Sequence, residues 1–298
     1  MDKLVLNGIV VKDKLDMANG LNHFFVDKVA KLVAGMPIPA TELLNELKAQ
    51  EPQNIPEMSL LELSSQGLDE LIKKVKKTPA SGVDHISGII LIDIYEVIKP
   101  SLLHLINLSM ATGIYPSILK LTKIVPILKQ GKDPLQLASY RPVSNISVVG
   151  KLLERAVMNQ VNAHVERFNL LHKDQHGGRA KHSTTTCLGE MVEDAKTALE
   201  GKMKVAIVAV DLTAAYDLCH HGILIQKCRH LNIGFETVNW ISSFLGQRSQ
   251  FVELNGASSE VRKTGDQGVV QGGPSSGNFF NFYINRLPAE VNKGKVAI

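Results

Sequence analysis

An apolar run that ends in a carboxylate is the first feature of this sequence that could do chemistry. Residues 205–210 (Val-Ala-Ile-Val-Ala-Val) lead directly into Asp211, and Tyr216 and Asp217 follow five and six positions later. A short run rich in β-branched residues predicts a strand buried on both faces, with Asp211 where the strand leaves the core. An acid fixed at a strand end suits a metal-dependent active site, and the alternative is a strand followed by an Asp-initiated turn.

Periodicity and turn signals predict the elements that would position this stretch. Helical patterns cover residues 15–34, 41–49, 66–77, 86–98, 101–112, 147–168, 183–200, 221–231, 236–245 and a final apolar segment after Pro274. Residues 122–129 read as an edge strand because Pro126 interrupts them. Asn255-Gly256 predicts a hairpin between 249–254 and 258–264. Helices and strands mix irregularly, which favours an α+β fold.

Composition narrows the class of protein. With 298 residues, 44% of them apolar, the chain can bury a sizeable core, and its net charge of +4 is compatible with nucleic acid without being diagnostic. Three scattered cysteines indicate reduced thiols in an intracellular protein, and a metal site built on Cys219 and Cys228 is disfavoured because a helix would point them to opposite sides. No secretory signal or membrane-spanning run is expected.

Six motifs occur in a fixed order along the chain. They are Pro79–Asp84, Pro126–Lys129 with Ser139–Ser144, Lys151–Arg155, Gln175–Arg179 with Ser183–Thr186, Asp211–Asp217, and Gly268–Gly272 continuing through Pro288. Together they resemble the reverse transcriptases of non-LTR (LINE-type) retrotransposons. The resemblance implies a right-hand polymerase fold with fingers and a partial palm over residues 59–298, the thumb being absent. Residues 1–58 would form a helical N-terminal appendage joined through proline-bearing turns.

The resemblance also implies the activity and its metal. The family adds dNTPs to a primer 3′-hydroxyl under the direction of an RNA template, with two divalent ions clamping the attacking and leaving oxygens. Asp211 and the Leu212 carbonyl would bind Mg²⁺ or Mn²⁺, because such ions take carboxylate and carbonyl oxygens. Tyr216 would exclude ribonucleotides by standing under the sugar, with a core aromatic as the alternative. Asp217 is expected to be structural.

Further residues would hold the nucleotide. Arg141 would bind the triphosphate through paired N–H donors of its guanidinium. Lys129 is a candidate for the same task or a solvated turn residue. Gln271 and Gly272 lie in a glycine-flanked turn at a helix start, where they could touch the nucleotide or cap the turn. Arg179 and Lys181 are candidates for template contact. The cluster Lys73, Lys74, Lys76 and Lys77 could contact the RNA template or DNA primer backbone or form a solvated face.

The sequence departs from the family in several places. Gly178 stands where the family has Phe, Val270 where it has Pro, and Arg286 where Asp is common. The family's aromatic-Ala-Asp-Asp motif does not occur in the 298 residues. We therefore expect this polypeptide alone not to polymerise, and the alternative to a reverse transcriptase fragment is a remnant that binds nucleic acid without chemistry. The compartment within the cell and the oligomeric state are not assigned by the sequence.

Overall fold

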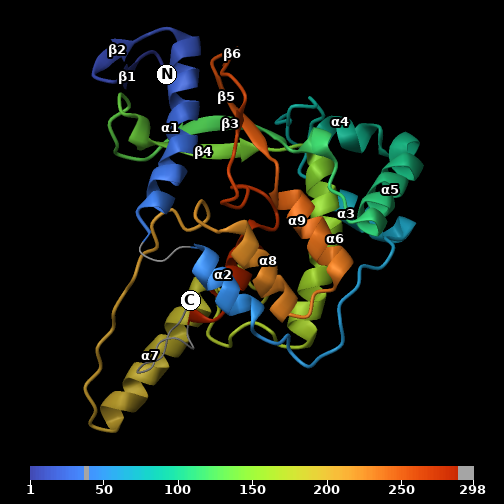
Figure 1. Cartoon of the computed structure of the whole chain (residues 1–298), viewed down its shortest axis with the longest axis vertical. Coiled ribbons are helices and arrows are strands. Elements are labelled where there is room, and N and C mark those ends of the chain that lie inside the picture. Colours follow the sequence, from blue (N-terminus) through green and yellow to red (C-terminus); the bar gives the residue numbers. More distant parts are fainter. Residues whose placement is uncertain (37–39, 288–298) are drawn as a thin grey trace.

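A mixed sheet and the N-terminal helix form one part of the molecule, and a bundle of helices forms another (Figure 1). The computed structural model describes residues 1–36 and 40–287. The sheet runs in the order β4-β3-β5-β6, and β7 also pairs with β5. Its strands are β3 (Leu121–Leu128), β4 (Tyr140–Asn145), β5 (Ser249–Leu254), β6 (Ala257–Ser258) and β7 (Arg262–Lys263). The α+β class expected from the sequence is consistent with this arrangement.

The central strand β3 carries a proline, and the prediction that it lies at an edge is wrong. It pairs antiparallel with β4 along its length and parallel with β5 only from Leu121 to Ile124. Pro126 lies beyond that parallel pairing and opposite Pro142 of β4. A proline lacks an amide hydrogen, so it is tolerated here because this half of β3 has a neighbour on one side only.

A second core joins the N-terminal residues to the sheet. Helix α1 (Lys14–Ala34) begins after Asp13, whose side chain accepts from the Asp16 amide, and it buries Met17, Leu21 and Phe25. These side chains pack with residues of all three long strands, namely Ile124, Tyr140, Val252 and Leu254. The short hairpin of β1 (Leu4–Leu6) and β2 (Ile9–Val11), which the sequence did not predict, lies beside α1. The boundary expected near residue 58 stays a prediction, although α1 itself shares a core with the sheet.

The larger core lies between helices. The helices of this part are α2 (Ala40–Lys48), α3 (Ser65–Lys73), α4 (Gly88–Asp93), α5 (Tyr95–Thr112), α6 (Val148–Arg167), α8 (His221–His230), α9 (Phe235–Leu245) and α10 (Ser276–Ile284), with short 3-10 turns at Ser117–Leu119 and Leu137–Ser139. Trp240 is fully buried, stacks on Phe244, and donates its indole N–H to the Ser109 hydroxyl at 2.9 Å. Aromatic stacking and a satisfied indole make this the rigid centre of the molecule.

Most predicted helices agree with the structure within a few residues, and α5 is the informative exception. It was expected to begin after Pro100, but it begins at Tyr95 and contains Pro100. Proline removes one helical hydrogen bond without ending the helix when the surrounding turns are packed, as they are here through Tyr95 and Leu102. The helix ends as predicted at Gly113, which has the left-handed φ of 66° that glycine favours.

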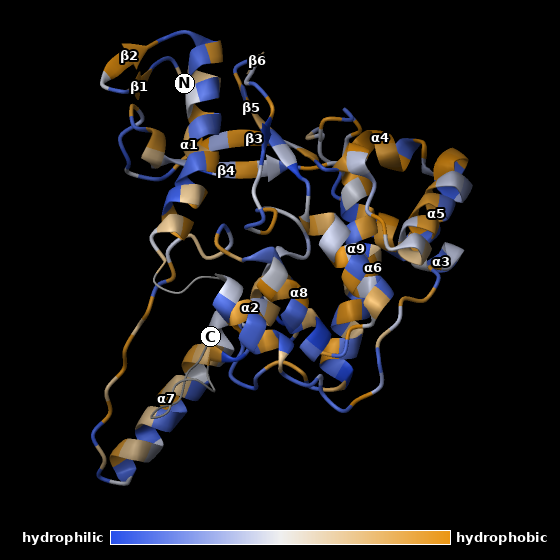
Figure 2. Cartoon of the chain, viewed as in Figure 1, coloured by the Kyte–Doolittle hydropathy of each residue, from blue (hydrophilic) through white to orange (hydrophobic). Residues whose placement is uncertain are grey.

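The apolar run 205–210 that precedes Asp211 does not form a strand. Residues 203–212 are irregular and exposed, with Val208 at 82% and Val210 at 79% exposure. They pair with no strand among the described residues, and a strand without neighbours is not stable in water. The preceding helix α7 (Thr184–Glu200) begins with the predicted Ser183 cap but buries none of its side chains. Figure 1 shows α7 and this segment extending away from the rest of the molecule, and in Figure 2 parts of both have the colour of hydrophobic residues.

The hairpin turn predicted at Asn255-Gly256 is present in the structure. Asn255 and Gly256 have φ values of 49° and 85°, as the predicted hairpin turn requires. Cys187, Cys219 and Cys228 are free thiols. None of the helices that the structure describes is long and apolar enough to cross a bilayer.

Candidate functional site

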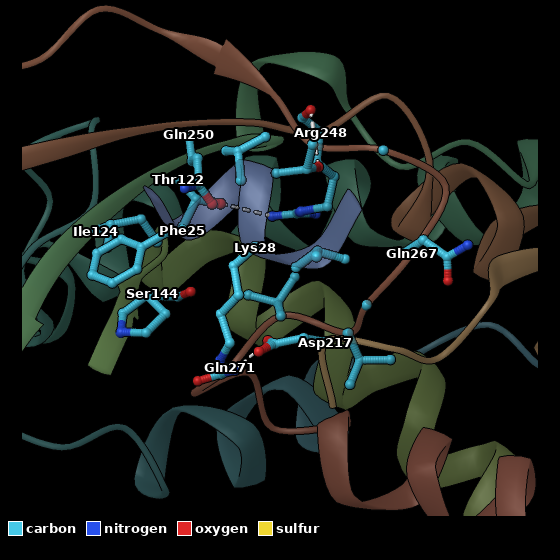
Figure 3. A pocket seen from close by; sticks show the side chains of 18 of the residues that line it. Phe25, Lys28, Thr122, Ile124, Ser144, Asp217, Arg248, Gln250, Gln267 and Gln271 are labelled. Carbon is cyan, nitrogen blue, oxygen red and sulfur yellow. Dashed lines mark hydrogen bonds between the residues drawn. The ribbon is translucent and has the colours of Figure 1, made fainter. Parts of the chain in front are cut away.

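Two adjoining hollows meet at Gln271. The first lies between α1, the sheet and the loop 264–271. Figure 3 shows Lys28, Asp217 and Gln271 converging in it, with Arg248 and Thr122 above them. The second is lined by the turn 214–216 on one side and by residues 271–273 and the start of α10 on the other. Because Gln271 lines both, one ligand could extend from one hollow into the other.

The turn that carries Gln271 is fixed from two sides. The Ser144 amide of β4 donates to the Gln271 carbonyl at 3.2 Å, which ties the turn to the sheet. The Gln271 side-chain amide donates to the Asp217 carboxylate. Gly272 has a φ of 98°, and a Cβ there would lie 3.3 Å from the Ser144 carbonyl oxygen. Glycine is therefore required at 272, both for the backbone angle and for the close approach to β4.

Asp217 and His221 are two of the titratable residues that line the first hollow. Burial raises the pKa of Asp217 above its ordinary range, against the opposing effects of the Gln271 hydrogen bond and the Lys28 charge. Burial lowers the pKa of His221, and its Nε2 lies 2.8 Å from the Gly268 carbonyl. Since a carbonyl oxygen can only accept, the neutral His221 ring donates from Nε2 and braces the loop.

The structure brings together three of the residues singled out by sequence. Tyr216, Gln271 and Gly272 line the second hollow. The Tyr216 ring lies 5.2 Å from that of Phe280 on α10, centre to centre, and its side chain is 39% exposed. Tyr216 thus contacts a partly buried aromatic and stays partly exposed, and its role against a sugar stays a prediction.

Asp211 and Leu212 lie elsewhere. Both are exposed in the irregular segment after α7 and line neither hollow. Across residues 1–36 and 40–287, no group of three or more His, Cys, Asp or Glu side chains could hold a metal ion. The described residues therefore do not fit a two-ion site by themselves, since such a site needs several oxygen ligands at once.

The two proposed triphosphate ligands lie on different sides of the sheet end. Lys129 lines the first hollow and donates to the Ala138 carbonyl at 2.7 Å. Arg141 stands opposite Ile127 and is exposed, whereas the alternate residues Tyr140, Pro142 and Ser144 line the hollow. Successive strand residues point to opposite faces, so Arg141 leaves the sheet on the face away from α1.

The candidates for contact with a template are dispersed. Arg179 makes a two-pronged salt bridge with Glu166 of α6, at 3.0 and 3.1 Å, so its guanidinium already has a carboxylate partner. Lys181 is exposed and has a positive φ of 63°. The four lysines at the end of α3 are exposed: Lys73 in its last turn, and Lys74, Lys76 and Lys77 after it. Neither hollow is lined by any of them.

Sequence reasoning missed three residues that shape the site. Glu154 of α6 is fully buried and accepts from the Ser275 amide at 2.8 Å, directly below the Gln271 turn. Arg248 is buried in the wall of the first hollow, where it donates to the Phe244 carbonyl at 3.0 Å and to the Thr122 hydroxyl at 3.3 Å. Lys28 enters from α1. A charged residue inside an apolar helical pattern was the one signal available for Glu154 and Lys28, because buried charges require a partner or a function.

A family model described as reverse transcriptase (RNA-dependent DNA polymerase) matches residues 127–298, which is more than half of the chain. The match includes β4, β5, the Tyr216 turn and the Gln271 turn, all of which contribute residues to the hollows. The chain therefore belongs to the reverse transcriptase family.

Three curated relatives show which group of reverse transcriptases the chain is similar to. The RNA-directed DNA polymerase from mobile element jockey of Drosophila funebris is 30% identical over 219 residues, 74% of this chain and 24% of the relative. The jockey protein of Drosophila melanogaster is 26% identical over 78% of this chain and 25% of its own length. The probable RNA-directed DNA polymerase from transposon BS of the same species is 25% identical over 74% and 24%. The resemblance to reverse transcriptases of non-LTR retrotransposons is confirmed, and the chain spans about a quarter of the length of these relatives.

Proposed function

We propose that this chain is the nucleotide-binding part of a non-LTR retrotransposon polymerase that adds dNTPs to a DNA primer on an RNA template. One observation carries the proposal: Tyr216 lines one hollow together with Gln271 and Gly272, which lie far from it in sequence. Residues 121–145 and 249–263 would then belong to the fingers, and the Tyr216 and Gln271 turns to the palm. The activity itself would use Mg²⁺ or Mn²⁺, for which Asp211 and the Leu212 carbonyl are the ligands that the chain offers.

The residues of the hollow suit a deoxynucleotide. The Tyr216 ring is held from behind by Phe280, so it can stand as a flat wall against a sugar. A bulky ring against C2′ rejects ribose, because the 2′-hydroxyl is the group that distinguishes RNA from DNA precursors. The backbone amide of Gly272 precedes α10, and a helix start favours phosphate oxygens. Lys129 offers a cation from the neighbouring hollow.

Equilibrium binding to the 298-residue chain tests the proposal. We expect fluorescently labelled dTTP to bind in the presence of Mg²⁺, and unlabelled dTTP to compete more strongly than UTP. Tyr216→Ala should bring the two competitors to similar strength, since it removes the wall that rejects ribose. Phe235→Ala, which alters an aromatic that is 65% exposed on α9, is the matched control and should leave the preference unchanged. A wild-type chain that binds neither nucleotide, or that binds both equally, would overturn the proposal.

A further inference from the structure

Helix α1 forms a wall of the first hollow, although the family match begins only at residue 127. The helix is held in place by polar contacts as well as by its apolar face. Asn22 donates to the Ser259 hydroxyl at 3.0 Å and to the Glu260 carbonyl at 2.7 Å, and it accepts from Gln250 of β5 at 3.0 Å. Asp27 pairs with Arg262 at 2.9 Å. Contacts on both sides of the helix fix the direction in which its intervening side chains point.

Lys28 points into the hollow from this wall. It lies one turn after Phe25, which is buried against the sheet, and Figure 3 shows it extending toward Asp217 and Gln271. Among the described residues, its ammonium group has no hydrogen-bond acceptor and no carboxylate within salt-bridge distance. A partly buried lysine without a partner is unusual, because desolvating an ammonium group is costly unless a ligand or solvent compensates.

The charge of the hollow is unbalanced toward the positive. Its lining contains Lys28, Lys129 and Arg248 but only one carboxylate, Asp217. Arg248 is engaged by the Phe244 carbonyl and Thr122, and Lys129 by the Ala138 carbonyl. Lys28 is thus the cation of this lining for which the described residues provide no hydrogen-bond partner, so all three of its donors are available to a ligand.

The electrostatics of Lys129 agree with this geometry. Burial lowers the pKa of Lys129, and the positive charges of Lys28, Arg141 and Lys132 lower it further. Three cations, on α1, on β4 and in the turn after β3, therefore act on Lys129, and of these Lys28 shares the hollow with it. Positive charges that outnumber the carboxylates nearby attract an anion with several negative groups.

We propose that Lys28 of α1 binds the phosphate groups of a nucleotide whose sugar lies against Tyr216 in the adjoining hollow. This inference rests on the proposed function for the nature of the ligand, but the residue and its helix lie outside the matched family segment. The N-terminal helix is then part of the nucleotide site. Its ammonium group acts as a point charge on a flexible stem, a suitable partner for a triphosphate.

The test compares three variants of the 298-residue chain. Lys28→Gln removes the charge, Lys28→Arg keeps it, and Lys31→Gln changes an exposed lysine one turn further along the same helix. With dTTP and Mg²⁺, we expect Lys28→Gln to weaken binding about tenfold, corresponding to ~1.4 kcal/mol, and Lys28→Arg to stay within about threefold of wild type. Lys31→Gln should bind as wild type does.

A second ligand separates phosphate binding from a structural role. Thymidine lacks phosphates, so Lys28→Gln should leave its affinity unchanged if the lysine contacts phosphate, and should weaken it if the hollow has merely changed shape. Inorganic tripolyphosphate should compete with dTTP on wild type and lose that ability on Lys28→Gln. Thermal unfolding followed through Trp240 identifies any variant that has failed to fold, and Lys28→Met, which preserves the apolar stem, then replaces Lys28→Gln.

The outcomes distinguish this inference from the proposed function. If Gln271→Ala weakens dTTP binding but Lys28→Gln does not, the nucleotide site stands and the role of Lys28 is refuted. If tripolyphosphate binds through Lys28 but dTTP and UTP bind with equal affinity, the anion site stands and the nucleotide assignment fails. Equal effects of Lys28→Gln on dTTP and thymidine would mean that Lys28 only shapes the hollow, for instance by compensating the Asp217 charge, and would overturn the inference.

Discussion

The buried carboxyl of Glu154 gives the sharpest quantitative test of the structure. Its Oε1 accepts from both the amide and the hydroxyl of Ser275, and its Oε2 has no hydrogen-bond partner among the described residues. Burial raises the pKa of Glu154 above its ordinary value of 4.5, and the Ser275 bonds and the charges of Arg248 and Lys151 oppose this only in part. The structure thus predicts a carboxyl that holds its proton when the chain folds.

The sign of the pH dependence follows from proton uptake. In the unfolded chain Glu154 ionises near pH 4.5, whereas in the folded chain it stays protonated to a higher pH. Between these two values the folded state binds one more proton, so the free energy of unfolding falls as pH rises, by about 1.4 kcal/mol per pH unit at most. The contribution to stability is complete below pH 4.5 and is lost as pH rises through the folded pKa.

Glu154→Gln removes this dependence while keeping an acceptor for Ser275. We expect the variant to have nearly the stability of wild type at pH 5 and to become more stable relative to wild type as pH is raised to 8. Glu154→Ala, in contrast, leaves the Ser275 amide without a partner and opens a cavity, which should cost about 3 kcal/mol at pH 5. This cost relative to wild type should shrink as pH rises, because the variant also lacks the titrating carboxyl. The sign of the glutamine effect at high pH thus distinguishes a neutral carboxyl from an ionised one.

Urea unfolding followed by tryptophan fluorescence measures these differences. Trp240 is the single tryptophan of the chain and is fully buried, so its emission reports loss of the larger core. Glu193→Gln on the exposed surface of α7 is the control, and its stability relative to wild type should not change with pH. If Glu154→Gln instead loses stability against wild type as pH rises, the carboxylate is ionised and stabilised by charge in the folded state, and the reasoning is refuted.

Two further predictions concern reactivity. Cys187 should react with iodoacetamide in the folded chain while Cys219 and Cys228 do not. Burial raises the pKa of both buried thiols to about 12, and the thiolate is the reactive form. Mass spectrometry of the labelled protein checks this, and early labelling of Cys228 would contradict it. Trypsin at low ratio should cut first after Lys202 or Lys204, because the exposed segment that follows α7 has no strand partner among the described residues, and a first cut elsewhere would show that the segment is protected.

Local signals in the sequence predicted the helices well because those signals are strong and self-contained. The Ser183 cap and the glycine at 113 mark helix ends through backbone hydrogen bonds and a left-handed φ, and both operate without tertiary partners. The position of β3 in the sheet could not be predicted, since its parallel neighbour β5 comes from a distant part of the chain. Pro126 shows that one amide hydrogen is missing from β3. The sequence does not show on which side of the strand that hydrogen would have been needed.

The residues of the candidate site likewise divide into those that local motifs identify and those whose role depends on tertiary packing. The turns bearing Tyr216 and Gln271 were found from their motifs, and the structure places them around one hollow. The apolar run 205–210 reads as a buried strand on composition alone, but burial requires a neighbouring segment, and none is present among the described residues. Lys28 and Glu154 escaped notice because their roles depend on which distant element packs against them, and periodicity carries no such information.

The packing of α1 also constrains how the molecule is made. Met17, Leu21 and Phe25 are covered by Val252 and Leu254, which belong to a strand near the other end of the chain. During synthesis α1 leaves the ribosome before β5, and its apolar face must wait until β5 has been translated. Contacts between such distant segments form late and slow the final step of folding. The apolar face of α1 is therefore open to wrong contacts until β5 is available to cover it.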